Sequence, residues 1–507
     1  MIVSRSNARS AALGAVLSVL FLTFLDTTIV SVALGNLAGD VSAGVIPLQW
    51  VINAYALAFA ALMLTGGSLA DRFGRKRLML VGIAVFCVGS LMCALASGVA
   101  LVIAGRAVMG VGAAAAEPGT LSVIRQLYPH RAQRARALGA WSAVSGLALA
   151  LGPVLGGLLV DAGGWRSIFW FNLAAGSVLA VWVFAVVPES ADRAAGRLDA
   201  AGLVLGAAGV GCVVFAAISG EYQGYGAAWV VALFVVGGGC LLAFVPVERR
   251  VQRPMLDPTY FREPIVRAAL FAAFAVYFGV FALFFLTALY LDIGQQYSGA
   301  RLAAMFAPMA AAIVVGGVAA GRWVARSGSR PPMAIGCGIA ALGMLLARAE
   351  LGAQQRLDFA LLSLALALAG LGFGVTVVPL TSAVLSHVPA RHSGIAASAT
   401  NTARQLGAVV GVAALGAIVN AHLTATVNRE FTGTLLGPSR KPVLKILETG
   451  GSGVGFSLDQ IPQVFVIAFV DGVRVALVVA TVLVLLAGLA AALVREPADA
   501  ELAPEVS

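Results

Sequence analysis

Charged residues are scarce in this chain: only 11% of its 507 residues are Asp, Glu, Lys or Arg. Soluble proteins of ordinary composition carry about 25% charged residues. Hydrophobic residues make up 60% of the sequence, and the mean hydropathy is +0.96. A water-soluble core cannot bury so much apolar surface, so the composition excludes an ordinary soluble protein and predicts a chain that is solvated by lipid.

Lysine, histidine and cysteine are also rare. The three lysines, Lys76, Lys441 and Lys445, lie outside any GxxxxGK[ST] loop, which argues against a nucleotide-driven motor. The four histidines form no HExxH pair, and the five cysteines form no CxxC pair. The sequence therefore predicts no enzyme, no metal site and no cofactor, and the energy for any work must come from a gradient.

Long apolar stretches recur along the whole chain. A helix needs about 20 largely apolar residues to cross a bilayer, and the sequence contains fourteen such stretches. The predicted fold is an all-α polytopic membrane protein with 14 spans. The helices are expected at 11–34, 49–70, 78–97, 100–124, 137–160, 167–188, 200–219, 228–247, 266–290, 301–324, 332–349, 358–381, 395–420 and 463–493.

The basic residues are distributed unevenly between the predicted loops. Most of the 33 Lys and Arg residues lie on one side of the membrane if both termini are cytoplasmic, as the positive-inside rule requires. A missed helix would move every later loop to the other side and destroy this bias. The net charge of +10 therefore reports topology and does not indicate a nucleic-acid partner. The expected location is the cell membrane, with both termini in the cytoplasm.

Two helix ends carry the same pattern, Gly…Arg-x-Gly-x-Arg. The first copy is Gly67–Arg77 and the second is Gly321–Arg330, where Ala325 replaces Asp71. A repeat displaced by about half the chain suggests two six-helix bundles in parallel orientation. The expected units are a first bundle at 1–190, two inserted peripheral helices with cytoplasmic linkers at 191–265, and a second bundle at 266–507 that includes a polar external loop at 421–462 and a short cytoplasmic tail.

Four motifs in this order resemble the major facilitator superfamily. They are Leu25–Leu34 (LDTTIVSVAL), Gly67–Arg77 (GSLADRFGRKR), Arg106-x-x-x-Gly110-x-Gly112 and Gly152-Pro153-x-x-Gly156-Gly157. The first motif and the 14 spans resemble the family's fourteen-spanner drug:proton antiporters. The resemblance implies a central cavity between two halves that opens alternately to either side. The chain departs from the family at Met109, where members carry Gln, and in the helix at 395–420, which lacks a carboxylate.

Ionisable groups inside a membrane are costly, so each is a functional candidate. Asp26 and Arg106 lie at similar predicted depths and can pair if their helices are neighbours. Glu117 follows Arg106 by eleven residues, which places both on one helix face. We expect Asp26, Glu117 and Arg106 to couple transport to protons. The alternatives are a structural Asp26–Arg106 pair and a Glu117 that satisfies backbone groups near Pro118.

Other candidates have conformational or packing roles. The resemblance implies a gating motif at Gly67, Asp71, Arg72, Gly74, Arg75 and Lys76, where Asp71 can cap a helix or pair with an Arg of the other half. The alternative is that Arg72, Arg75, Lys76 and Arg77 simply determine topology. A packing motif that resembles that of antiporters is expected at Gly152, Pro153, Gly156 and Gly157, although packing alone explains these residues equally well. Cavity lining is expected from Asn53, Tyr55, Gly110, Ala113, Asn401, Arg404 and Gln405. Asp471 and Arg474 are expected to form a structural pair.

The function that these features favour is export of amphipathic, cationic compounds in exchange for protons. The expected partners are a small-molecule substrate, protons and the lipid bilayer. An exporter of a metabolite, a lipid-like molecule or a self-made antibiotic is an open alternative, and so is a sensor that no longer transports. The intact Asp26 and Glu117 argue against the sensor. The sequence leaves open the substrate, the proton stoichiometry and the oligomeric state, although one copy is expected to suffice.

Overall fold

The computed structural model describes residues 5–41, 45–191, 199–251, 262–291, 299–352, 358–389, 392–431 and 463–494. Within these ranges the chain is helical and contains no strand. The helices are α1 (Arg5–Ile29), η1 (Val30–Ala33), α2 (Leu34–Val41), α3 (Val45–Phe73), α4 (Arg75–Ala94), α5 (Val99–Leu127), α6 (Arg131–Gly163), α7 (Arg166–Val186), α8 (Ala200–Gln223), α9 (Ala228–Glu248), α10 (Pro264–Leu289), α11 (Gly299–Ser327), α12 (Arg330–Glu350), α13 (Phe359–His387), α14 (Ser393–Phe431) and α16 (Gln463–Leu493).

Thirteen helices of the described chain are long and apolar enough to cross a membrane, and a bent pair within α6 brings the number to as many as 14. The two parts of α6, Ala132–Leu149 and Val154–Gly163, meet at 44°. The all-helical fold and the span count are therefore confirmed. One boundary was wrong: α14 continues to Phe431, so residues 421–431 are helical, while 432–462 and the tail after 494 lie outside the described residues.

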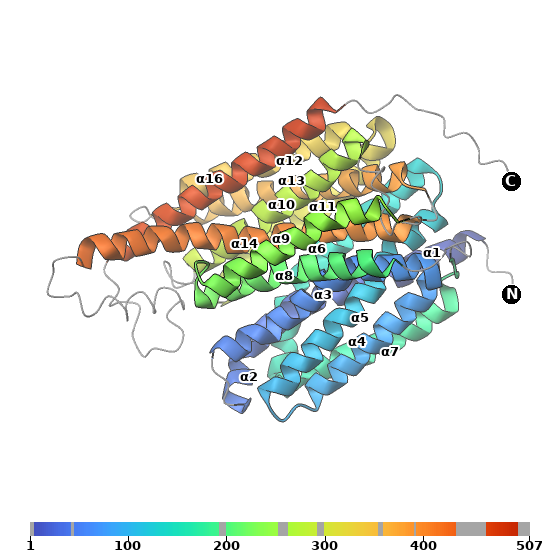
Figure 1. Ribbon diagram of the computed structural model, residues 1–507, viewed down its shortest axis with the longest axis horizontal. Coiled ribbons are helices and arrows are strands. Elements are labelled where there is room, and N and C mark those ends of the chain that lie inside the picture. Colours follow the sequence, from blue (N-terminus) through green and yellow to red (C-terminus); the bar gives the residue numbers. More distant parts are fainter. Residues whose placement is uncertain are drawn as a thin grey trace.

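The spanning helices are arranged in two groups (Figure 1). Helices α1 and α3–α7 pack on one another, and so do α10–α14 and α16. Small residues allow close approach in both groups. A Cβ atom added to Gly82 of α4 would lie 2.6 Å from the carbonyl oxygen of Gly112 in α5. A Cβ atom added to Gly372 of α13 would lie 2.2 Å from the backbone nitrogen of Ala340 in α12.

The repeated motif forms two equivalent contacts between the groups at their cytoplasmic ends. A Cβ atom on Gly67 of α3 would lie 2.5 Å from the carbonyl oxygen of Gly394 in α14. A Cβ atom on Gly321 of α11 would lie 2.7 Å from the carbonyl oxygen of Ala135 in α6. Seven residues after each of these glycines, a further glycine ends the helix with positive φ, 108° at Gly74 and 79° at Gly328. We call these two contacts, Gly67 with Gly394 and Gly321 with Ala135, the cytoplasmic seams. Both seams are closed.

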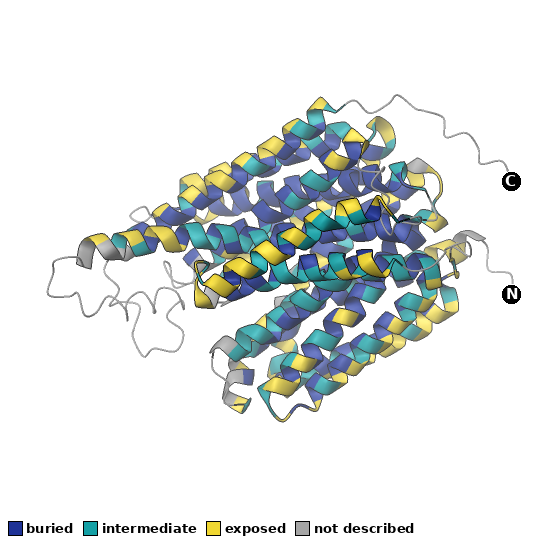
Figure 2. Cartoon of the chain, viewed as in Figure 1, coloured by how far each residue is buried: buried dark blue, intermediate teal, exposed yellow. Residues whose placement is uncertain are grey.

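The inserted helices α8 and α9 differ in their surroundings. Most side chains of α9 are at least partly exposed, as Figure 2 shows, which fits the expected peripheral position. Helix α8 is instead packed against both α3 and α14, where Val214 and Ile218 are buried with Leu64 and Ile395. The expectation that both helices are peripheral was wrong for α8, because its small and branched side chains fill the groove between the two groups. A buried acid, Glu248, ends α9, one residue beyond the predicted helix 228–247.

Candidate functional site

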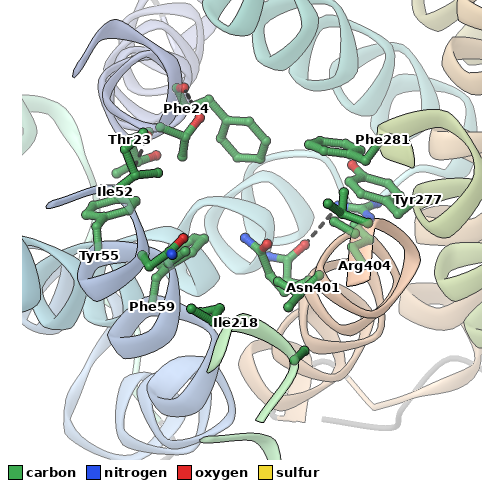
Figure 3. A pocket seen from close by; sticks show the side chains of 18 of the residues that line it. Thr23, Phe24, Ile52, Tyr55, Phe59, Ile218, Tyr277, Phe281, Asn401 and Arg404 are labelled. Atoms are coloured by element: carbon green, nitrogen blue, oxygen red, sulfur yellow. Dashed lines mark hydrogen bonds between the residues drawn. The ribbon is translucent and has the colours of Figure 1, made fainter. Parts of the chain in front are cut away.

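A cavity of about 290 Å³ lies between the two halves (Figure 3). Helices α1, α3, α5 and α6 line it from the first half, α10 and α14 line it from the second, and α8 adds Ala217 and Ile218. Figure 3 shows the aromatic side chains Phe24, Tyr55 and Phe59 on the side opposite Tyr277 and Phe281. The wall therefore combines flat apolar surfaces with a few polar groups, as is common for sites that bind small amphipathic molecules.

The cavity extends from the middle of the molecule to its external side. Its floor contains Glu117, ten residues before the cytoplasmic end of α5, and Asn401, eight residues after the start of α14. These separations correspond to about 15 Å and 12 Å along the helix axes. The lining continues along α14 to Ala413, near the external side. Because both cytoplasmic seams are closed, the cavity is separated from the cytoplasmic side.

Asp26 lies at the centre of a buried network within the first half. One of its carboxylate oxygens forms an ion pair with Arg106 Nη1, and the other accepts a hydrogen bond from Asn172 Nδ2 at 2.7 Å. Arg106 also donates through Nε to the carbonyl oxygen of Val51 at 2.9 Å, and its guanidinium lies 4.5 Å from the ring centre of Tyr55. Arg106 and Tyr55 line the cavity, whereas Asp26 lies behind them. The sequence analysis missed Asn172, whose signal is a carboxamide inside the apolar helix α7.

Glu117 reaches the cavity itself. It is only 1% exposed, and its Oε1 accepts a hydrogen bond from Asn401 Nδ2 of the second half at 3.2 Å. Its Oε2 has no hydrogen-bond partner in the structure. The shared helix face that was inferred for Arg106 and Glu117 is present, since both line the same cavity.

Arg404 is the second cation in the cavity wall, and its partners were not identified from the sequence. Its Nη1 donates to Asn401 Oδ1 at 2.8 Å, and its Nη2 donates to Thr381 Oγ1 of α13. The guanidinium carbon lies 5.0 Å from the ring centre of Trp141 and 5.6 Å from that of Tyr277. Aromatic faces attract guanidinium groups, so two hydrogen bonds and two aromatic rings hold Arg404, while its buried Nε has no partner.

The structure places five of the seven expected lining residues at the cavity and two elsewhere. Asn53, Tyr55, Asn401, Arg404 and Gln405 line the cavity. Gly110 and Ala113 are buried and do not line it. A Cβ atom on Gly110 would lie 2.5 Å from the carbonyl oxygen of Tyr55, so this glycine provides a close contact between α5 and α3 and not open volume.

The motif between α3 and α4 joins the two halves at the cytoplasmic side. Asp71 accepts hydrogen bonds from the backbone N–H groups of Gly394 and Ile395, both at 2.9 Å, and so caps the start of α14. It also forms an ion pair with Arg75 at 2.8 Å within its own half. Glu189, which the sequence analysis missed, accepts hydrogen bonds from the N–H groups of Lys76 and Arg77.

The remaining residues of this motif lie close to aromatic rings. The Arg72 guanidinium is 5.4 Å from the ring centre of Phe73, and the Lys76 amine is 5.0 Å from that of Phe184. Gly74 ends α3 close to Glu189, because a Cβ atom there would lie 2.6 Å from Glu189 Oε1.

The glycines of α6 pack against the end of α1. A Cβ atom on Gly152 would lie 1.9 Å from Thr28 Oγ1, and one on Gly156 would lie 2.6 Å from the carbonyl oxygen of Ile29. Gly157 has open space around it and is not part of this contact. Pro153 has no N–H to donate to the carbonyl of Leu149, and Thr28 Oγ1 donates to that carbonyl at 3.2 Å.

The expected pair in α16 does not form. Asp471 and Arg474, both described, share no ion pair, and Arg474 Nε lies 3.4 Å from the carbonyl oxygen of Arg348, to which it donates. Asp471 is exposed, whereas Arg474 is bonded to the backbone of α12.

Sequence comparison matches this chain to one transporter family and to several of its members. A model of the Major Facilitator Superfamily matches residues 16–412. The multidrug resistance protein Stp of Mycobacterium tuberculosis is 33% identical over 474 residues, which cover 91% of this chain and 87% of that protein. The puromycin resistance protein pur8 of Streptomyces alboniger is 36% identical over 408 residues, which cover 80% of each chain. The probable actinorhodin transporter of Streptomyces coelicolor is 32% identical and covers 83% of this chain and 75% of that protein.

Solved structures share the fold. The human organic anion transporter MFSD10 (TETRAN) matches with a TM-score of 0.62 and 14% identity, covering 95% of this chain and 100% of that chain. The proton:xylose symporter XylE matches with a TM-score of 0.59 and 15% identity, covering 94% and 95%. The chain, a multi-pass protein of the cell membrane and a transporter rather than an enzyme, therefore belongs to the Major Facilitator Superfamily.

Proposed function

We propose that this protein exports amphipathic, cationic small molecules in exchange for protons by alternating access. The observation that carries the proposal is Glu117, a buried carboxylate with one unpaired oxygen in the wall of an aromatic cavity between the two halves. A carboxylate in this position can bind either a proton or the positive group of a substrate. The names of relatives as multidrug resistance and drug efflux proteins support export of such compounds.

Competition at Glu117 provides the coupling. A bare carboxylate is costly to move through a low-dielectric region, whereas a protonated or substrate-paired one is not. The carrier therefore changes sides with a proton or with a cation. Exchange of one proton for one monovalent cation is electroneutral and is driven by the pH gradient alone. A second proton would add about 2.3 kcal/mol for each 100 mV of membrane potential.

Asp26 contributes through Arg106. The ion pair neutralises Arg106, which faces the cavity. If Asp26 takes up a proton, Arg106 becomes an uncompensated cation in the cavity wall and repels a cationic substrate. Asp26 therefore acts as a second proton-binding group although it does not touch the cavity. The gating residues around Asp71 hold the cytoplasmic side closed, and the units 1–190 and 266–507 move as the two bundles.

The proposal is tested by proton-driven uptake of a fluorescent cation into inverted membrane vesicles. We expect Glu117→Gln and Asp26→Asn each to reduce accumulation by about tenfold or more, the loss that removal of a proton-transfer group usually causes. Asp161→Asn is the matched control, because Asp161 is an exposed acid of α6, and it should accumulate the cation normally. Normal pumping by Glu117→Gln would show that the coupling group is assigned wrongly.

A second candidate function is export of a neutral or endogenous compound, such as a self-made antibiotic. The relative named as a probable actinorhodin transporter favours it. The same vesicle uptake assay distinguishes the two candidate functions. If the wild-type protein accumulates a neutral aromatic compound but no cation, the second candidate is correct.

A further inference from the structure

Five buried residues form a closed ring of contacts between the two halves at the floor of the cavity. Asn401 Nδ2 donates to Glu117 Oε1 at 3.2 Å, and Arg404 Nη1 donates to Asn401 Oδ1 at 2.8 Å. The Arg404 guanidinium lies 5.0 Å from the ring centre of Trp141, whose Nε1 donates to Thr120 Oγ1 at 3.2 Å. Thr120 Oγ1 in turn donates to the backbone carbonyl of Glu117 at 2.6 Å. We call these residues the inter-bundle ring.

The ring connects different helices of both halves. Glu117 and Thr120 belong to α5 and Trp141 to α6, whereas Asn401 and Arg404 belong to α14. Two separate contacts therefore cross between the halves, a hydrogen bond to Glu117 and a guanidinium on Trp141. Figure 3 shows Asn401 and Arg404 beside the cavity, joined by a hydrogen bond.

Burial makes these contacts strong. Glu117 and Trp141 are 1% exposed, Thr120 is fully buried, and Asn401 and Arg404 are 3% exposed. Hydrogen bonds to an ionised group are stronger than neutral ones, and low dielectric strengthens them further. The halves cannot separate at the cavity floor without exposing or unpairing these groups.

The strength of the ring depends on the charge of Glu117. The other titratable or charged groups in the cavity wall are Arg106 of the same helix, Tyr55 of α3, Tyr277 of α10 and Arg404. Arg106 is paired with Asp26, so Arg404 is the cation that an ionised Glu117 balances across the interface. When Glu117 gains a proton, the bond from Asn401 loses its charged acceptor and the charge of Arg404 is no longer balanced.

We propose that the inter-bundle ring is a lock that keeps the empty carrier facing outward while Glu117 is ionised, and that protonation of Glu117 opens it. This inference rests on the proposed proton exchange and assigns Asn401, Arg404 and Trp141 as positioning residues for it. Sustained export requires the empty carrier to return to the cytoplasmic side. The lock prevents that return unless a proton has bound from outside, so substrate efflux becomes dependent on protons.

The test is downhill uptake of the fluorescent cation into inverted vesicles, with the same pH on both sides and the membrane potential clamped. Wild-type uptake should slow as the common pH rises, because fewer carriers are protonated and the return step is locked. Asn401→Leu keeps the side-chain volume and removes both hydrogen bonds. We expect its uptake to depend less on pH than that of wild type, because Glu117 remains ionisable, and to be about tenfold faster than wild type at high pH, the factor that loss of one hydrogen bond to a charged group produces. Its uphill accumulation in a pH gradient should fall.

Two further variants make the test decisive. Asn420→Leu is the matched control, because Asn420 is an exposed amide near the external end of the same helix, and its uptake should follow wild type. Trp141→Phe removes the bond to Thr120 and should change the pH dependence in the same direction even if Asn401→Leu does not fold. The lock is refuted if both variants keep the wild-type pH dependence while wild type still accumulates the cation in a gradient. If wild type itself shows no proton-driven accumulation, the proposed exchange is refuted instead.

Discussion

Two buried carboxylates of this transporter are held in different ways. Both oxygens of Asp26 have donors, from Arg106 and Asn172, and the group lies behind the cavity wall. Glu117, which lines the cavity, has one donor, Asn401, and one buried oxygen without a partner. At the scale of single residues, both oxygens of Asp26 are therefore paired, whereas Glu117 has one oxygen that could accept a further donor.

This difference predicts a larger loss of stability for a substitution at Asp26 than for one at Glu117. Asp26→Asn leaves Arg106 as a buried cation without its partner, and the free energy of unfolding should fall by about 3–5 kcal/mol. Glu117→Gln keeps a hydrogen-bond acceptor for Asn401, and Arg404 keeps its bonds to Asn401 and Thr381, so the loss should be smaller, about 1 kcal/mol. Thermal unfolding of both variants in the same detergent measures the contrast. Equal losses for the two variants would contradict the different roles of the carboxylates.

The sequence pointed to the charged residues of the buried network and the cavity wall but not to their uncharged neighbours. Asp26, Arg106 and Glu117 stand out because charge is costly in apolar helices. Asn172 and Thr381 carry no charge, and such side chains occur in many membrane helices without a function. Helix spacing places Gly110 on the face of Arg106, but a small residue suits a cavity and a close helix contact equally well. The contact with α3 decides this position, and only the tertiary structure supplies it.

At the scale of elements, apolar length determines the helices, and the expected boundaries lie within a few residues of the observed ones at most helix ends. The position of α8 could not be inferred in this way. A helix that is apolar on all sides can face lipid or fill a groove, and hydropathy does not distinguish these environments. Pro153 lies at the bend of α6, where it has no N–H to donate to the carbonyl of Leu149. The hydroxyl that donates to this carbonyl, that of Thr28, comes from α1.

Thr28 should therefore stabilise the contact between α1 and α6. Thr28→Val keeps the shape of the side chain and removes its hydrogen bond to the carbonyl of Leu149. We expect a loss of about 1–2 kcal/mol, because Pro153 has no N–H to donate to that carbonyl. Thr27→Val is the control, since the Thr27 hydroxyl donates to Phe24 within α1. Comparable thermal unfolding of the two variants would show that the bend does not need Thr28.

At the scale of the whole molecule, the repeated motif makes two similar seams with one difference. Both Gly67 and Gly321 allow backbone contact across the halves. Only the first seam has an acid, Asp71, that caps a helix of the other half, because Ala325 replaces it in the second. The sequence revealed the repeat and this substitution. It did not reveal which side is closed, because the same residues must serve the inward-facing and outward-facing arrangements.

The first seam should control how readily the cytoplasmic side opens. Gly67→Ala places a methyl group 2.5 Å from the carbonyl oxygen of Gly394, and backbone atoms there cannot move without separating α3 from α14. We expect the carrier to shift toward the inward-facing arrangement. Ser142→Cys, in a background without the native cysteines, reports the opening, because Ser142 is buried beside Gly317 at the second seam.

Labelling of this cysteine by a membrane-impermeant maleimide in inverted vesicles should be at least about fivefold faster with Gly67→Ala, the change that about 1 kcal/mol in the conformational equilibrium produces. Gly157→Ala is the matched control, because a Cβ atom at Gly157 meets open space, and labelling should then stay at the wild-type rate. If the two halves move as rigid units, a methyl group at the first seam should expose the second. Unchanged labelling with Gly67→Ala would show that the two seams open independently and that the halves do not move as units.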